Sequence, residues 1–423
     1  MKRNVRALDA LNFCNAGIQT GLGPFISIYY GSTRHWDPSR IGILLGCQSF
    51  AGIFTQALVG HLVDESRHKR MLTAVAALAV SAGALGIATL PSFTSQVVVQ
   101  LIIGLGVTVF PAATAAFALG MVGREQLPHR LARNEVLTHT GNVVFAIVAA
   151  FVGTMLALRG IFFAAAIFAA GMAGAAVFIR EAEIDYEGAR AGAVAPDGAA
   201  LARRTARALL SDRRILVYMV AVVLFNVSNS ATLPLVGQLF TRQGHHGRSA
   251  AWQTAMAVLV AEVVMVGTAF VTGRGAATRG RKPLFMIAFA MLAVRNALGV
   301  VSHAPWYLIA LQTFDGVAAA IYGVLLTLVT ADLAEGTGRF NFLQGTVQSA
   351  MGLGGFLSNL AFGFIAHRIS FDASFWGLSA TAVVGGVLYA LKMPETKPGA
   401  TPRPPRADRS PRPAEARYAA GSP

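Results

Sequence analysis

Amide side chains lie at helical spacing inside two strongly apolar stretches of the chain. Asn12, Asn15 and Gln19 fall at positions i, i+3 and i+7 of the first stretch, and Asn226 and Asn229 repeat the start of this pattern in the seventh. Residues at these spacings share one face of a helix. In apolar surroundings each such face either lines a polar cavity that binds a solute or holds neighbouring helices together by hydrogen bonds. We favour the cavity.

Of two further polar stripes, one includes groups that can titrate. His139 is a candidate proton carrier because histidine titrates near neutral pH, and a neutral, hydrogen-bonded histidine is the alternative. The stripes consist of Glu135, His139 and Asn142 in the fifth apolar stretch and of Asn341, Gln344 and Gln348 in the eleventh.

Three charged residues, Glu262, Arg295 and Asp315, lie deep inside apolar stretches of the second half. At 1.5 Å per residue they are about 15 to 18 Å from the ends of their helices, near the centre of a hydrocarbon layer about 30 Å thick. An unpaired charge there is costly, and arginine cannot readily lose its proton. We expect Arg295 to form a structural pair with Glu262, which leaves Asp315 and nearby Gln312 facing the cavity. One static buried triad is the alternative.

The composition places these residues in a membrane protein. Of the 423 residues, 54% are hydrophobic and only 13% are charged, and the mean hydropathy is +0.56. A soluble domain carries about 25% charged residues, so a soluble enzyme is excluded. About 20 apolar residues cross a bilayer as a helix, and the chain holds about twelve such stretches. They start near Ala7, Ser39, Met71, Gln96, Asn134, Gly160, Ile215, Ala250, Pro283, Pro305, Asn341 and Ser374.

The basic residues indicate orientation rather than a nucleic-acid partner. The chain has a net charge of +15, but most of its basic loop residues fall on one side of the predicted spans, together with both termini. By the positive-inside rule that side is cytoplasmic. The loop residues on it are Arg67, Lys69, Arg70, Arg124, Arg130, Arg133, Arg274, Arg279, Arg281 and Lys282.

Polar breaks divide the chain. We expect a first bundle of six helices over residues 1–180, a cytoplasmic linker over 181–214, a second bundle over 215–392 and a disordered tail over 393–423, which is rich in proline and arginine. Within the linker, residues 201–210 form either a short basic helix on the lipid headgroups or part of a solvated connection.

The two predicted bundles share an internal repeat. Asn12-x-x-Asn15 recurs 214 positions later as Asn226-x-x-Asn229, and Gln100-x-x-x-Gly104 recurs 212 positions later as Gln312-x-x-x-Gly316. Matches in the same order at nearly constant offset indicate a duplicated six-helix unit. Duplicated halves that face each other across a site in the middle of the membrane are typical of transporters.

The loop motifs resemble those of the major facilitator superfamily, over nearly the whole length to Lys392. Gly60, Asp64 and Lys69 match its signature after the second span, and Gly273, Gly280, Arg281 and Lys282 match the second-half copy. Gly104 and Gly106 match part of its span-four motif, whereas Gly153 lacks the proline that follows in drug/proton antiporters. Segments at Gly21–Pro24 and Arg133–Glu135 look like those of uncharacterised bacterial efflux permeases.

The resemblance implies an all-α fold of about twelve transmembrane helices in two pseudo-symmetric bundles. It also implies a charge network that gates the cytoplasmic side, and static surface ion pairs are the alternative. The candidate gating residues are Gly60, Asp64, Arg67, Lys69, Arg133, Glu135, Gly273, Arg281 and Lys282.

We therefore expect a secondary active transporter of a small solute that works by alternating access. It would be an exporter in the bacterial inner membrane, coupled to a proton gradient, with Asp315, Glu262 and His139 as proton-coupling candidates. An uncoupled facilitator or importer is one alternative, and a non-transporting receptor or assembly factor is another. Besides the solute, protons and membrane lipids, we expect no nucleic acid, ATP, metal or cofactor, and no enzymatic activity.

Overall fold

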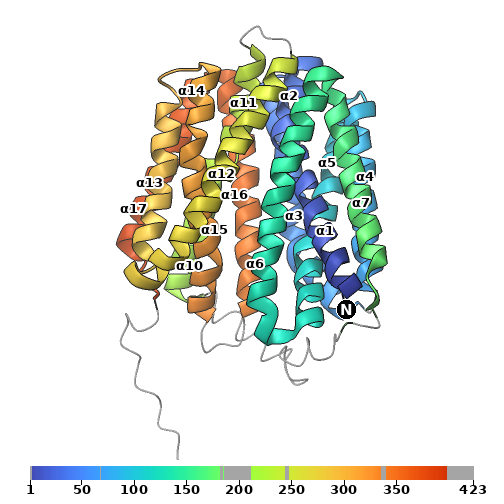
Figure 1. The fold of residues 1–423 in the computed structure, drawn as a ribbon. Helices are drawn as coiled ribbons and strands as arrows, with labels where there is room; N and C mark the ends of the chain where they lie inside the picture. Colours follow the sequence, from blue (N-terminus) through green and yellow to red (C-terminus); the bar gives the residue numbers. More distant parts are fainter. Residues whose placement is uncertain are drawn as a thin grey trace, which may run out of the picture.

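The computed structural model describes residues 2–66, 68–181, 184, 211–242, 247–334 and 340–397, and in these ranges it contains helices and short connections (Figure 1). The first half holds α1 (Lys2–Gly21), α2 (Pro24–Thr33), α3 (Pro38–Glu65), α4 (Lys69–Thr89), α5 (Phe93–Val107), α6 (Val109–Met155) and α7 (Leu158–Phe178). The second half holds α10 (Arg213–Asn229), α11 (Thr232–Arg242), α12 (Gly247–Arg279), α13 (Lys282–Leu298), α14 (Pro305–Ala310), α15 (Gln312–Ala334), α16 (Phe340–Arg368) and α17 (Phe371–Lys392).

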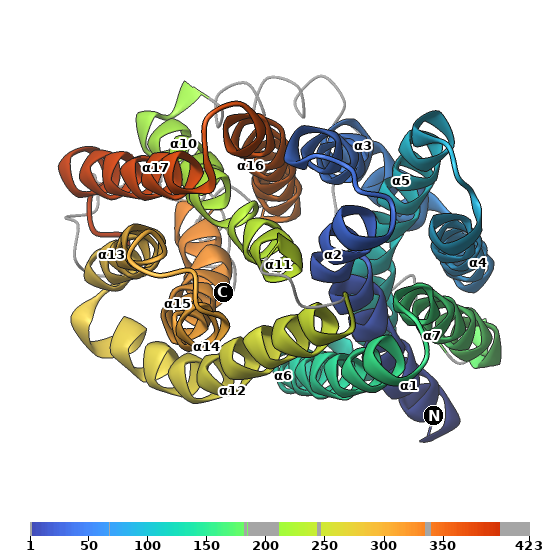
Figure 2. The same cartoon turned by 90° about the horizontal axis from the view of Figure 1, so that it is seen from above.

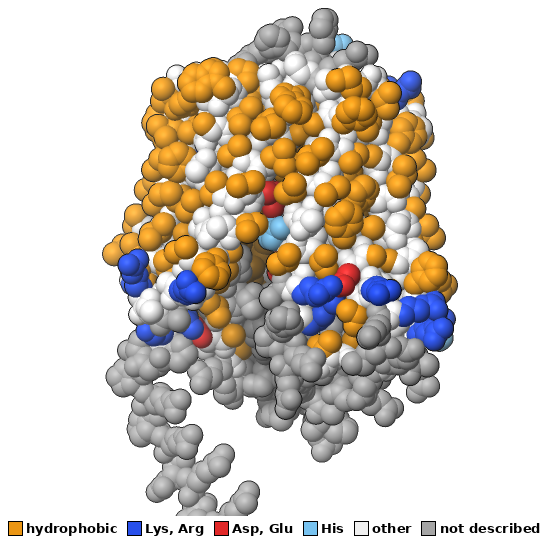
Figure 3. All heavy atoms as spheres, in the orientation of Figure 1, with side chains coloured by type: hydrophobic (Ala, Val, Ile, Leu, Met, Phe, Trp, Pro, Cys, Tyr) orange, Lys and Arg blue, Asp and Glu red, His pale blue; other side chains and the backbone are white. Residues whose placement is uncertain are grey.

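Within the described residues, nine helical stretches are long and apolar enough to cross a membrane. Each contains or adjoins one of the predicted span starts, and the other three starts fall on α1, α3 and α13. The total of twelve spans stays a prediction. Large apolar side chains such as Ile167 and Leu391 are more than 70% exposed on the outer surface, and Figure 3 shows apolar atoms over most of the visible face. Such a surface fits a lipid environment.

Seen from above, α1–α7 and α10–α17 form two bundles that lie side by side (Figure 2). The bundles meet along three seams, where α3 packs against α16, α6 against α12, and α2 against α11. Most of the predicted linker and tail lies outside the described residues, including the proposed surface helix at 201–210.

Two helices are interrupted at corresponding places in the halves. The first predicted span is broken at Leu22–Gly23, between α1 and α2, and Pro24 begins α2. The seventh predicted span is broken at Ser230–Ala231, between α10 and α11. An interrupted helix leaves backbone groups unpaired at membrane depth, which is tolerated where the chain is buried in protein or lines a cavity. Both breaks do line the cavity described below.

Lysine and arginine side chains gather at the end of the molecule where the N-terminus lies (Figures 1 and 3), which we name the basic end. Each half has a glutamate there that caps a helix. Glu181 Oε1 accepts from the backbone N–H of Arg70 at 3.0 Å, and Glu395 accepts from those of Arg281 and Lys282 at 2.8 and 3.1 Å. Burial raises the pKa of Glu395, but its backbone N–H donors lower it more, so the net pKa lies below its usual value. These glutamates, 214 positions apart, extend the repeat.

Candidate functional site

Glycines bring α3 and α16 together at the end opposite the basic end. A Cβ atom at Gly42 would collide with the backbone oxygen of Asn359, and one at Gly363 would lie 2.7 Å from the carbonyl oxygen of Pro38. Asp37 and His367 also face each other there, with Oδ1 and Nδ1 3.8 Å apart. This seam therefore depends on the absence of side chains at Gly42 and Gly363.

At the other two seams the helices approach each other equally closely. A Cβ atom at Gly237 of α11 would lie 2.9 Å from Oγ of Ser27 in α2, and one at Gly153 of α6 would lie 2.7 Å from Cβ of Ala251 in α12. In the described part of the chain, the polar contacts between the halves lie at this end or in the middle of the molecule. The two halves are therefore sealed against each other at the opposite end.

Substitution of Gly42 by alanine should loosen this seal. Overpacking costs about 1–3 kcal/mol, enough to raise the population of a state open at the opposite end by about 5- to 150-fold. Spin labels at Thr33 and Trp306, in a background without Cys14 and Cys47, should report longer distances. The control is Gly174→Ala, because a Cβ atom there meets nothing within 4 Å. Equal distances in both variants would contradict the role of this seam.

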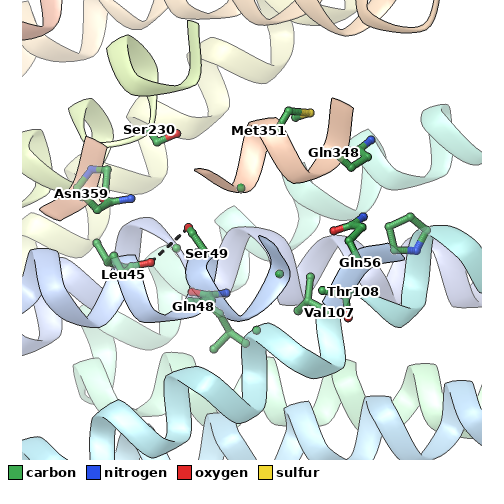
Figure 4. A pocket seen from close by; sticks show the side chains of 17 residues that line it. Leu45, Gln48, Ser49, Gln56, Val107, Thr108, Ser230, Gln348, Met351 and Asn359 are labelled. Atoms are coloured by element: carbon green, nitrogen blue, oxygen red, sulfur yellow. Dashed lines mark hydrogen bonds between the residues drawn. The ribbon is translucent and has the colours of Figure 1, made fainter. Parts of the chain in front are cut away.

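A cavity of about 390 Å³ lies among the two helix breaks, α3, α16 and the junction of α5 with α6. Figure 4 shows Ser49 and Gln56 of α3 on one side and Gln348, Met351 and Asn359 of α16 on the other. None of the described residues that line it is charged. Its polar side chains are Gln48, Ser49, Gln56, Thr108, Ser230, Gln348 and Asn359.

Of the predicted cavity residues whose side chains the structure describes, only Gln348 lines this space. Asn12 and Gln312 instead donate to carbonyl groups one turn earlier in their own helices. Asn226 donates to Val222 O and to Tyr322 Oη, both at 2.8–2.9 Å. Asn15 Oδ1 and Gln344 Oε1 are buried without a partner, and the side chains of Gln19 and Asn341 lie outside the described part.

The sequence did contain a signal for the residues that were missed. Gln48, Gly52 and Gln56 are spaced i, i+4 and i+8 along α3, and Gln348, Gly352, Gly355 and Asn359 follow a similar stripe along α16. Polar residues that alternate with glycines on one helix face are a weaker sign of a cavity than the amides of the first and seventh spans, which follow one another at every turn of the helix face.

One buried polar cluster joins the two halves. The carboxylate of Glu262, on α12, accepts a hydrogen bond from Asn142 Nδ2 at 2.8 Å and lies 2.7 Å from Nδ1 of His139. Both partners lie on α6 of the first half, and Glu262 is 8% exposed. The three residues, which we name the bridging cluster, give the α6–α12 seam a contact that protonation can change.

A second cluster lies inside the second half. Arg295 pairs with Asp315 and donates from Nη2 to Asn229 Oδ1 at 2.8 Å, and it is 2% exposed. The predicted pair between Arg295 and Glu262 is therefore wrong in this structure. The reason is helix packing, because α13 packs closely against α15, which carries Asp315, whereas α12 presents Glu262 to the other half.

The predicted gating residues at the basic end pair within their own halves. Arg133 donates to both oxygens of Asp9 on α1, at 3.1 and 2.7 Å, and Arg281 pairs with Asp332 at 3.0 Å. Asp9 was not recognised from the sequence.

The remaining gating candidates make no described contact between the halves. Glu135 is exposed, Lys69 is buried at the start of α4, and Lys282 begins α13. Gly60 lies in α3, and a Cβ atom at Gly273 would meet nothing within 4 Å. Arg67 and the side chain of Asp64 lie outside the described part. Among the described residues there is also no group of three or more potential metal ligands.

Comparisons with known proteins agree with this arrangement. A family model described as Major Facilitator Superfamily matches residues 8–294 and 275–422. An uncharacterised MFS-type transporter of Mycobacterium tuberculosis is 36% identical over 400 residues, which cover 93% of this chain and 94% of the relative. Among solved structures, a mutant of the nucleoside transporter NupG has a TM-score of 0.77 at 14% identity, covering 92% of this chain and 99% of its own. A D-xylose–proton symporter has a TM-score of 0.72 at 15% identity, covering 93% and 97%.

Proposed function

Because the chain belongs to the major facilitator superfamily, we propose that it is a secondary active transporter that moves a small solute across a membrane by alternating access. The observation that carries this proposal is the position of the cavity beneath the seal that joins the two helical bundles at the end opposite the basic end. Rocking of the bundles about the cavity would open this seal and close the basic end.

We further propose that the bridging cluster couples transport to protons. An ionised Glu262 holds His139 and Asn142 across the α6–α12 seam, and protonation of the carboxylate would weaken this attraction. Nearby charged groups do not compensate, since Asp315 is paired with Arg295 and Asp9 with Arg130 and Arg133. Glu135 lies one turn from His139 and is exposed. The D-xylose–proton symporter, by its name, is a fold relative that uses protons.

The direction that we propose is export. An uncoupled facilitator or an importer is the alternative, and a pH gradient distinguishes them. Proteoliposomes that contain the purified protein would be loaded with a defined mixture of solutes, and the loss of each solute would be followed with and without a pH gradient. Loss that accelerates with the gradient supports coupled export, and loss at one rate in both conditions supports a facilitator.

We propose that the protein lies in the bacterial inner membrane with the basic end and both termini in the cytoplasm. A cysteine introduced at Gly244 should then react with an impermeant reagent added to intact cells, whereas one at Gly188 should react only after the cells are opened. The opposite pattern would reverse the orientation. Both positions lie outside the described residues.

At the basic end, we propose that Asp64 and its neighbouring charges form a gate when that end closes. The charges described there now pair within each half, as expected of a network that is not engaged across the halves. Asp64→Asn should therefore slow transport more than it lowers expression. Wild-type turnover in this variant would reduce Asp64 to a surface charge.

A further inference from the structure

We propose that the transported solute is uncharged and rich in hydroxyl or amide groups, and that it binds between the amide side chains of α3 and α16, an assignment that rests on the transport function proposed above. The walls of the cavity carry Gln48 and Gln56 from α3 and Gln348 and Asn359 from α16. Figure 4 shows Gln56 and Gln348 toward one end of the space and Ser49 and Asn359 toward the other.

These amides have hydrogen-bonding capacity to spare. The side chains of Gln48, Gln56 and Gln348 make no hydrogen bond to another described residue, whereas Asn359 uses only Nδ2, which donates to Gly355 O at 2.9 Å. Each amide is both donor and acceptor. Hydroxyl and amide groups of a solute are also both donors and acceptors, so they can donate hydrogen bonds to these side chains or accept hydrogen bonds from them.

A charged solute would find no counter-charge among the described residues of the cavity wall. The charged residues of the two buried clusters are already paired, since Glu262 binds His139 and Asn142 while Arg295 binds Asp315. An ion that leaves water for a buried site without an opposite charge loses its hydration without compensation.

A purely apolar solute also fits poorly, because it would leave the amides unpaired. The apolar lining instead offers surfaces for the face of a ring, from Leu22, Leu45, Val107, Pro111, Pro234 and Met351. The volume of about 390 Å³ lies near the lower end of the range of about 300–1,000 Å³ for sites that bind small organic ligands. A small polyhydroxylated ring compound meets all of these conditions.

The test uses the full-length protein in proteoliposomes loaded with an equimolar mixture of four classes. These are neutral polyols and nucleosides (glucose, inositol, uridine), anions (gluconate, uridine monophosphate), cations (choline, spermidine) and apolar amphiphilic cations (tetraphenylphosphonium). Mass spectrometry follows protein-dependent loss of each compound. We expect loss of one or more neutral compounds only. Loss confined to a charged or apolar class would overturn the substrate class while leaving transport intact, and no loss of any compound would contradict the transport function itself.

Variants then connect the solute with the cavity. Gln56→Met and Gln348→Met keep the length of the side chain but remove its hydrogen bonds, and each should lower the rate of neutral-solute loss about tenfold. Gly52→Leu should lower it at least as much, since a Cβ atom at Gly52 fits, 3.6 Å from Cγ2 of Thr108, and the rest of the side chain would enter the cavity. The matched control is Gly174→Leu, which faces open space. Unchanged rates in all three cavity variants would place the solute elsewhere.

Discussion

Replacement of Glu262 by glutamine should abolish the acceleration of transport by a pH gradient while solute exchange at equal pH continues. Glutamine has the shape of protonated glutamate and can still accept from Asn142, but it cannot release a proton. The bridging cluster would then stay in its weakly held state at every pH. Since coupling free energies are typically 1–3 kcal/mol, the gradient-driven rate should fall by about 5- to 150-fold.

The measurement is solute flux in proteoliposomes with and without the gradient. A matched control is Asp372→Asn, which breaks another histidine–carboxylate pair, with His303 at 2.8 Å, that lies on the surface within the second half. This control should keep the wild-type response. If Glu262→Gln also keeps it, Glu262 is a structural acid and the facilitator becomes the better account.

Replacement of Arg295 by methionine should destabilise the second half strongly. The change leaves the carboxylate of Asp315 unpaired and removes the donor to Asn229 Oδ1. Loss of one partner of a buried ion pair costs about 3–5 kcal/mol. We expect low expression and a lower unfolding temperature of the purified protein.

The double variant Arg295→Met/Asp315→Asn separates this cause from poor packing. Because the second change removes the orphaned charge, the double variant should regain much of the lost stability. Arg133→Met is the control, since Arg133 is exposed and surface ion pairs contribute only about 0–1 kcal/mol. A double variant as unstable as Arg295→Met alone would show that packing of the long side chain, rather than its charge, matters.

The fold could be predicted well from the sequence because a membrane permits few backbone conformations in the segments that cross it. A long apolar stretch such as Leu158–Phe178 must be helical in lipid, where the backbone has no other hydrogen-bond partners. Its length alone therefore places its ends within a few residues. The repeat of Asn12 and Gln100 in the second half then indicated two similar bundles.

The partners in the site could not be predicted in the same way. Sequence identified Glu262, Arg295 and Asp315 as buried charges, but their pairing depends on which helices are neighbours. Arg295 meets Asp315 because α13 packs on α15, and Glu262 meets His139 of the other half because α12 packs on α6.

Asn12 and Asn226 do not line the described cavity, for a local reason. Asn12 and Asn226 have carbonyl groups one turn away on the same helix, and they bond to these rather than to the cavity. The helix breaks at Leu22–Gly23 and Ser230–Ala231 then bring Leu22, Gly23 and Ser230, and not Asn12 or Asn226, to the cavity wall.

The distance across the seal as a function of pH tests most directly whether the bridging cluster links protons to the motion of the two halves. Spin labels at Thr33 and Trp306 would be compared in the wild-type protein and in Glu262→Gln. The carboxylate charge of Glu262 strengthens its contact with His139 and Asn142 of α6. At neutral pH the distances should therefore be shorter in the wild-type protein than in Glu262→Gln, and the wild-type distances should change more with pH than those of the variant. Equal pH dependence in both proteins would contradict the account.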